Sequence, residues 1–335
     1  MVQRRRRLLM VKQLQLIRPV NLIMVALTMC FMRYSIIIPF LEALSNMLEV
    51  DLHSQMSNFQ FALLVLSVLL ITAGGYVFND VMDVNIDRIN APERPMVKLN
   101  LSVKKYTTVA YILFGAGTIL GLVMAIQAGN MFLAMFHLVA VASLYVYSIA
   151  YKRSFLLGNL IITFLAALVP LIVGLFEVTQ LQLSYVSELK RFEDFNFNFL
   201  AYWIIGFAVF AAILTLAREI TKDAEDALGD KQFGAQTLPI KFGIPVTKGV
   251  ITAVYVGFLA ALWHVQYHYL PDQYTFIYCI VLSALTLGLI ASTFMAKDAK
   301  GFHWASTFNK LVSFIGLCYA LLVWYMIDSG QIFAQ

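Results

Sequence analysis

Residues 61–87 read FALLVLSVLLITAGGYVFNDVMDVNID, an apolar run that ends in three aspartates. From Phe61 to Phe78 the run carries no charge, and its length is close to the roughly 20 residues that an α-helix needs to cross a bilayer. The same succession recurs at residues 200–230, LAYWIIGFAVFAAILTLAREITKDAEDALGD. Both stretches therefore predict a membrane-spanning helix that carries an acidic cluster at one end.

The composition of the whole chain supports a membrane protein. Of its 335 residues, 61% are hydrophobic and 13% are charged, whereas about 25% are charged in soluble domains. Strand-like alternation is absent, so helices must satisfy the backbone hydrogen bonds. We expect an all-α polytopic protein, a single transmembrane domain over residues 1–335 with about nine membrane-spanning helices. The predicted spans are 19–43, 59–79, 106–127, 130–151, 155–177, 200–221, 247–265, 274–296 and 308–328.

Positive charge predicts the orientation of these spans. If the N-terminus, with Arg4 to Arg7, is cytoplasmic and the spans alternate, every lysine and arginine lies on the cytoplasmic side except Arg33, Lys190 and Arg191. The basic N-terminal segment 1–13 then indicates membrane topology and anionic lipid, and we expect no nucleic-acid partner. Arg33 is the one charge deep within a predicted span, and we expect it to face a cavity or carbonyl groups rather than lipid.

The chain also repeats itself at a coarse level. Four spans separate the two acidic motifs, so both motifs emerge on the same side of the membrane, where we place the active site. Basic residues close the fourth span at Lys152 and the eighth at Lys297. We therefore expect two four-helix units plus a ninth helix around a central cavity into which both motifs face. Residues 178–199 form the only sizeable external loop.

The aspartates follow the pattern D-x-x-D-x-x-x-D in both motifs. In a helix, residues with this spacing lie within about 60° of one face. Such clusters of like charge are costly near apolar surroundings unless a multivalent cation neutralises them. The available ligands are hard oxygens, which favour Mg²⁺ over zinc or copper. The expected metal ligands are Asn79, Asp80, Asp83, Asp87, Asp223, Asp226 and Asp230.

Basic residues accompany both acidic motifs and predict an anionic substrate. Mg²⁺ usually binds through a few carboxylates together with substrate phosphates, and basic groups take the remaining negative charge. The candidates are Arg88, Arg94, Lys152, Arg153 and Lys222. At a membrane surface this combination indicates a lipid diphosphate whose apolar tail lies among the helices. A transporter of lipid phosphates or divalent cations is the alternative from another class, although acids confined to one side of the membrane argue against ion conduction.

The chain resembles the UbiA superfamily of intramembrane prenyltransferases. The resemblance is carried by NDVMDVNID at 79–87, KDAEDALGD at 222–230, YSIAYKR at 147–153 and IRPVN at 17–21. It implies Mg²⁺-dependent transfer of a prenyl group from an allylic diphosphate to a membrane-associated acceptor. It also implies catalytic roles for Asp83, Asp87, Asp226 and Asp230, and substrate contacts from Arg18, Asn21 and Tyr147.

Two further segments resemble one branch of that family. DRINAPERP at 87–95 and REITKDAEDALGD at 218–230 are similar to the branch that adds geranylgeranyl to geranylgeranylglyceryl phosphate. Prenylation of an aromatic or tetrapyrrole acceptor by the same mechanism is the alternative.

Overall fold

A computed structural model describes residues 13–185 and 197–333 of the chain. Within these ranges all regular elements are helical, and nine helical segments are long and apolar enough to cross a membrane, as the sequence predicts. Arg4 to Arg7 lie outside the described residues, as do nearly all of segment 1–13 and half of the predicted loop 178–199.

The described helices follow one another along the chain. Their bounds are η1 Gln15–Ile17, α2 Pro19–Phe31, η2 Met32–Ile37, α3 Ile38–Leu48, α4 Asn58–Met82, α5 Val84–Asn90, α6 Pro95–Lys98, α7 Val103–Gln127, η3 Met131–Leu133, α8 Ala134–Val146, η4 Tyr147–Tyr151, α9 Leu157–Ser184, α11 Asn198–Gln232, α12 Leu238–Tyr269, α13 Gln273–Met295, α14 Ala299–Asp328 and η5 Gln331–Phe333. Three of these join end to end, so that α2, η2 and α3 form one span from Pro19 to Leu48.

Two spans begin earlier than the apolar pattern predicts. Helix α12 starts at Leu238 rather than at 247, because Pro239 occupies the first turn, where its missing N–H costs nothing. Its early part is set off by Gly243, whose φ of 82° and ψ of 165° break the helical winding. Helix α14 starts at Ala299 rather than at 308, because the Asp298 side chain caps its first turn. Pro239 and Gly243 before the apolar run of α12, and a polar first turn in α14, hide these starts from a hydropathy pattern.

The internal contacts gather the chain into two compact units. The first unit consists of the chain up to Leu27, Met56–Arg153 and Leu228–Gly234, and the second consists of Thr28–Gln55, Ser154–Ala227 and Ala235–Gln335. This division differs from two four-helix units plus a ninth helix. The first span is shared, because from Thr28 onward it belongs to the second unit, where η2 packs against α9 and α14.

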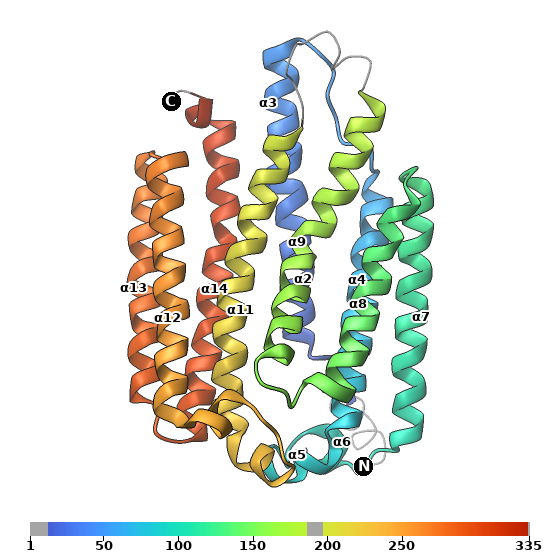
Figure 1. Cartoon of the computed structure of the whole chain (residues 1–335). Coiled ribbons are helices and arrows are strands. Elements are labelled where there is room, and N and C mark those ends of the chain that lie inside the picture. The colour runs from blue at the N-terminus through green and yellow to red at the C-terminus, as the bar shows by residue number, and fades with distance from the viewer. Residues whose placement is uncertain (1–12, 186–196, 334–335) are drawn as a thin grey trace, which may run out of the picture. The chain divides into compact units, whose positions relative to one another are not determined.

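In the first unit, α4 packs along α7 and α8 (Figure 1). A reciprocal capping box between Ser57 and Gln60 fixes the start of α4. Close approach of α4 and α7 depends on Gly74, where a Cβ would lie 2.9 Å from the Phe114 ring. The tight packing continues at the far end of α4, where Phe78 is fully buried directly before the first acidic motif.

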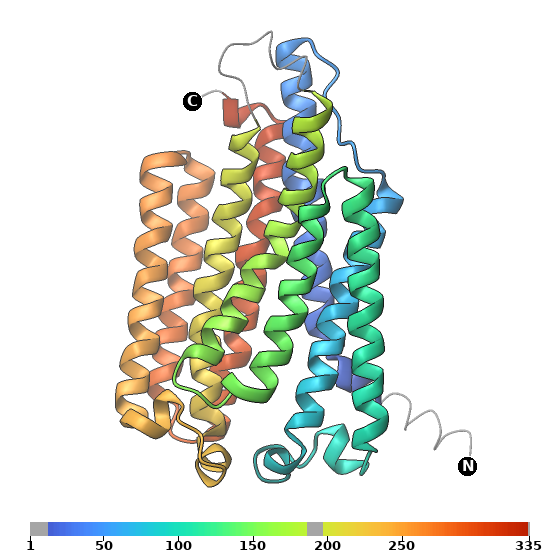
Figure 2. The ribbon, with the colours of Figure 1, turned by 45° about the vertical axis from the view of Figure 1, so that its right-hand side comes forward.

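In the second unit, α13 packs against both α12 and α14 (Figure 2). The π-helical turn η2 presents Arg33, which forms a buried ion pair with Glu177 of α9. The hydroxyl of Ser54 donates a hydrogen bond of 2.8 Å to the other Glu177 oxygen. Arg33 therefore avoids lipid as expected, but it contacts a carboxylate. That carboxylate was overlooked because α9 continues to Ser184, which places Glu177 inside the span and not at its end.

Candidate active site

The first acidic motif lies where α4 passes into α5. Helix α4 ends at Met82 and α5 begins at Val84, with Asp83 between them. The winding continues across this junction, since the Asp83 N–H bonds to the Asn79 carbonyl at 2.9 Å and the Asp87 N–H bonds to the Asp83 carbonyl at 2.8 Å. The three aspartates therefore stay on successive turns. The pattern predicts one regular helix here, whereas the structure has a break at Asp83.

Each aspartate of this motif is buried and paired with a different cation. Asp80, Asp83 and Asp87 are only 2–3% exposed. Arg18 Nη2 lies 2.8 Å from Asp80, and Arg18 also stacks over the Tyr76 ring at 4.8 Å. Each carboxylate of the cluster therefore has a cationic partner that offsets its charge.

Lys152 and Arg94 neutralise the other two aspartates. Lys152 contacts Asp83 and directly follows the π-helical turn η4, in which its N–H bonds to the Tyr147 carbonyl at 2.8 Å. Arg94, the residue before α6, donates from Nη1 to both oxygens of Asp87 at 2.7 and 2.9 Å. Three of the predicted substrate-binding cations thus lie on the first motif.

The environment shifts the pKa values of two of these groups. Burial raises the pKa of Asp87 to about 6, against the opposing charge of Arg94 and with a further increase from the Asp83 carboxylate. Burial lowers the pKa of Arg18, but the Asp80 carboxylate and Tyr76 outweigh it, so the net pKa of Arg18 is raised. Arg18 remains a cation in this setting.

Asn79 has one side-chain oxygen without a donor among the residues that the structure describes. Its Nδ2 donates to Asp83 at 2.9 Å, while its Oδ1 is buried with no hydrogen-bond partner in those residues. A buried acceptor without a donor is costly, and an ion or ligand at that position removes the cost. This oxygen lies beside the central aspartate of the motif, so the donor set fits a hard divalent cation.

The other predicted residues of the first unit take less part. Arg88 and Arg153 are exposed, and the structure shows no ion pair for either within the described ranges. Asn21 is half-buried, and its backbone N–H bonds to the Arg18 carbonyl at 2.9 Å. Tyr147 opens the π-helical turn that precedes Lys152. Their roles in binding substrate stay predictions.

The second motif lies near the C-terminal end of α11 and is more open. Asp223, Asp226 and Asp230 are half-buried, and Asp223 accepts a hydrogen bond of 2.9 Å from Asn159 of α9. Asp230 belongs to the first unit, with the first motif, whereas Asp223 and Asp226 belong to the second. Within the part of the chain that the structure describes, no three acidic, histidine or cysteine side chains gather as a metal site.

Sequence reasoning missed several polar partners in this region. Lys222, predicted to bind substrate, contacts Glu219 at 3.1 Å, and Arg218 contacts the same carboxylate at 3.1 Å. Asn159 is the third residue of α9, and its side chain is buried. A single amide side chain in an otherwise apolar span is the sequence feature that could have identified it. Glu225 lies 2.8 Å from His303 of α14, but it is not one of the spaced aspartates of the second motif and His303 lies 78 residues away.

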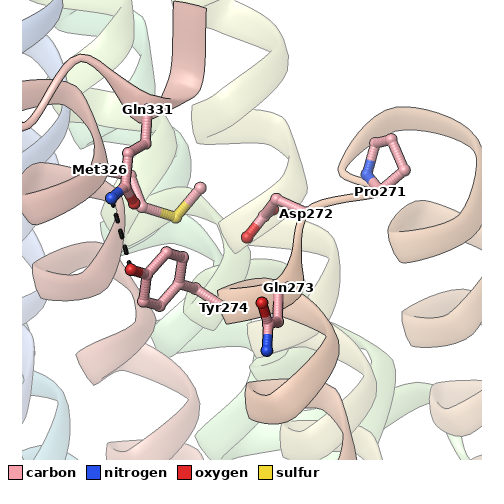
Figure 3. A pocket seen from close by; sticks show the side chains of 6 residues that line it. All are labelled: Pro271, Asp272, Gln273, Tyr274, Met326 and Gln331. Carbon is pink, nitrogen blue, oxygen red and sulfur yellow. Dashed lines mark hydrogen bonds between the residues drawn. The ribbon is translucent and has the colours of Figure 1, made fainter. Parts of the chain in front are cut away.

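A pocket of about 360 Å³ lies at the other end of the second unit. It is formed where α13 begins and α14 ends, and its walls include Asp272, Tyr274 and Met326 (Figure 3). Gln331 Nε2 donates to the Tyr274 hydroxyl across it at 3.4 Å. No residue of either acidic motif lines this pocket, so it is separate from the candidate active site.

The fold and the site define a class of protein, namely polytopic helical membrane proteins with paired aspartate motifs. Residues 51–314 match the UbiA prenyltransferase family, and the chain belongs to that family. It is therefore a prenyltransferase and an integral membrane protein.

Three curated relatives of the chain carry the name digeranylgeranylglyceryl phosphate synthase. The protein of Methanosphaera stadtmanae is 28% identical over 271 residues, covering 79% of this chain and 89% of its own. That of Methanothermobacter thermautotrophicus is 28% identical over 96% of this chain and 97% of its own. That of Methanoculleus marisnigri is 36% identical over a shorter stretch, 59% of this chain and 63% of its own.

Solved structures share the fold. A structure described as digeranylgeranylglyceryl phosphate synthase in membranes aligns with a TM-score of 0.62 at 22% identity, covering 94% of this chain and 98% of that one. A UbiA homologue from Archaeoglobus fulgidus bound to GPP and Mg²⁺ aligns with a TM-score of 0.56 at 17% identity, covering 93% and 99%.

Proposed function

We propose that the protein transfers a geranylgeranyl group from geranylgeranyl diphosphate to geranylgeranylglyceryl phosphate and releases diphosphate. The shared name of the relatives supports this acceptor. The observation that carries the proposal is the first motif, in which three buried carboxylates, three cations and the unpartnered Asn79 oxygen lie together.

The residues of this chain divide the work of holding the diphosphate. Asn79, Asp80, Asp83 and Asp87, with Asp223, Asp226 and Asp230 of the second motif, would hold Mg²⁺. Bound there, Mg²⁺ would supply positive charge against the charge that develops on the departing diphosphate. Arg18, Lys152 and Arg94 would turn from their aspartates to the diphosphate or to the acceptor phosphate. The other predicted contacts are Asn21, Arg88, Tyr147, Arg153 and Lys222.

The exchange of partners follows from the charges. In the described structure each cation neutralises one carboxylate of the first motif. With Mg²⁺ held by these carboxylates, Arg18, Arg94 and Lys152 would be available to anionic oxygens, which arginine can bind in bidentate fashion. The allylic C–O bond then breaks with both electrons on the diphosphate. The acceptor hydroxyl oxygen forms the new ether bond to the allylic carbon, and its proton passes to the departing diphosphate. The apolar helices keep water from the allylic carbocation.

The orientation belongs to the same proposal. With lysine and arginine concentrated at the motif-bearing helix ends, the positive-inside pattern supports an active site and N-terminus on the cytoplasmic side. Labelling of single cysteines placed at Lys98 and at Asp328 in sealed vesicles tests it. Only the Asp328 position reacts from the external side if the orientation holds.

A transfer assay with purified protein tests the function. Radiolabelled geranylgeranyl diphosphate is offered with a panel of acceptors, namely geranylgeranylglyceryl phosphate, aromatic acids and a tetrapyrrole. We expect labelled diether lipid only with the first acceptor and only with Mg²⁺. Labelled aromatic or tetrapyrrole product instead would replace the acceptor but keep the mechanism.

Two variants test the metal ligands directly. Asp83→Ala and Asp226→Ala each remove the central carboxylate of a motif, so both should abolish Mg²⁺-dependent diphosphate release. Asp328→Ala, an exposed acid at the C-terminal end of α14, is the matched control and should retain activity. Turnover near wild type in both motif variants would refute the assignment.

A further inference from the structure

The last residue of α5 touches the end of the second acidic motif. Asn90 closes the helix that carries Asp87, and its Oδ1 accepts a hydrogen bond of 2.9 Å from the backbone N–H of Gly229. Gly229 directly precedes Asp230, the final aspartate of the second motif. Both partners lie in the first compact unit. One hydrogen bond therefore connects the aspartate-bearing turns of the two motifs.

The contact explains why a glycine stands in this helix. Glycine is unfavourable inside a helix, so a glycine there is often found where a neighbouring group leaves no space for a side chain. A Cβ on Gly229 would lie 2.0 Å from Asn90 Oδ1 and 2.4 Å from its Cγ. The Asn90 amide thus occupies the space that any other side chain at 229 would need. Gly206 of the same helix has nothing within 4 Å of its Cβ position and meets no such demand.

We propose that Asn90 is a positioning residue that holds Asp230 at a fixed place relative to Asp87. This inference rests on the proposed function, because it assigns the two aspartates a common ligand. A side chain bonded to the Gly229 N–H fixes the main chain directly before Asp230. Asn90 itself touches no substrate in this scheme, since its oxygen is engaged by Gly229.

Hydrogen exchange in the metal-free protein tests the contact without any reaction. In Asn90→Ala the amides of residues 228–234 should exchange about tenfold faster, because the loss of one hydrogen bond to a buried amide favours local opening by that factor. Asn90→Asp keeps the accepting oxygen and should retain the protection. Equal exchange in wild type and Asn90→Ala would overturn the proposal.

Magnesium titration of the transfer reaction tests the consequence for the site. Asn90→Ala should raise the Mg²⁺ concentration for half-maximal rate about tenfold, the same factor as for the lost hydrogen bond, with little change in KM for the acceptor. Gly229→Ala should act alike, and the double variant should be no worse than Gly229→Ala alone, because the clash needs the Asn90 amide. Gly206→Ala is the matched control and should leave both readouts unchanged.

The two arms separate this inference from the proposed function. Faster exchange in Asn90→Ala with an unaltered Mg²⁺ titration would refute the positioning role while leaving the transferase proposal intact. If the wild type shows no transfer with any acceptor, the proposed function fails, and the exchange arm still decides whether Asn90 holds this segment. A fall in thermal stability of Asn90→Ala that Asn90→Asp shares equally would also overturn the positioning role.

Discussion

Replacing Lys152 by methionine should change the affinities for Mg²⁺ and for diphosphate in opposite directions. In the described structure the Lys152 ammonium contacts Asp83, whose side chain is 2% exposed, while the lysine side chain is 27% exposed. A metal ion that binds Asp83 must displace this ammonium. The diphosphate that follows gains it as a partner. Removing the lysine charge therefore raises the affinity for Mg²⁺ and lowers the affinity for diphosphate.

The size of each effect follows from the contact. Hydrogen bonds to charged groups contribute about 1.5–3 kcal/mol, and the partial exposure of the lysine points to the lower end, near ~1.5 kcal/mol. That free energy corresponds to roughly a tenfold change in a dissociation constant. We expect Lys152→Met to bind Mg²⁺ alone about tenfold more tightly, and to bind diphosphate at saturating Mg²⁺ about tenfold more weakly.

Calorimetry on the purified protein measures both constants. Lys98→Met is the matched control, because the Lys98–Glu93 pair also lies in the first unit but its side chains are 41% and 78% exposed. The control should leave both constants within a factor of about two, as exposed pairs contribute little. If Lys152→Met binds Mg²⁺ alone no more tightly than wild type, the exchange of partners is refuted.

Three further outcomes are expected. Arg94→Ala should raise the KM for the prenyl diphosphate about tenfold or more, because the guanidinium that would bind the diphosphate oxygens is lost. An unchanged KM and kcat would refute a diphosphate-binding role for Arg94. Arg33→Met should lower the free energy of unfolding in detergent by about 3–5 kcal/mol, because it leaves Glu177 buried without its cation; adding Glu177→Leu should restore most of the loss, and a cost that persists would refute the ion-pair argument. Gly121→Ala should destabilise by about 1–3 kcal/mol, since its Cβ would lie 2.4 Å from the His137 ring, whereas Gly115→Ala on the same helix has open space and should not lower the melting temperature.

The sequence predicts the helices well and their polar ends poorly. Nine apolar runs are sufficient to predict nine spans, because lipid leaves the backbone no alternative to helix. The starts of α12 and α14 escape prediction, because a capped or proline-bearing first turn resembles a loop in composition. The division into compact units escapes it too, since packing of η2 against α9 and α14 has no periodic signature.

In the candidate site, too, contacts between residues close in sequence can be predicted, whereas contacts between distant residues cannot. Spacing alone identifies Asp80, Asp83 and Asp87 as neighbours, because residues three and four apart share a helix face. It does not identify their cations, because Arg18 lies 62 residues from Asp80 and Lys152 lies 69 from Asp83. Pairings over such separations depend on how three helices assemble, which no short pattern encodes.

The π-helical turn at Tyr147–Tyr151 makes the length of this segment critical in a way that substitutions do not reveal. A π turn holds one residue more than regular winding allows, and each residue of an α-helix rotates the chain by about 100°. Deleting Ile149 would let the helix wind regularly and would swing the following lysine to another side of it. A relative that is one residue shorter here would need its lysine or arginine at a neighbouring position. A one-residue gap in this segment of an alignment therefore indicates a rearranged site, even where all the aspartates are retained.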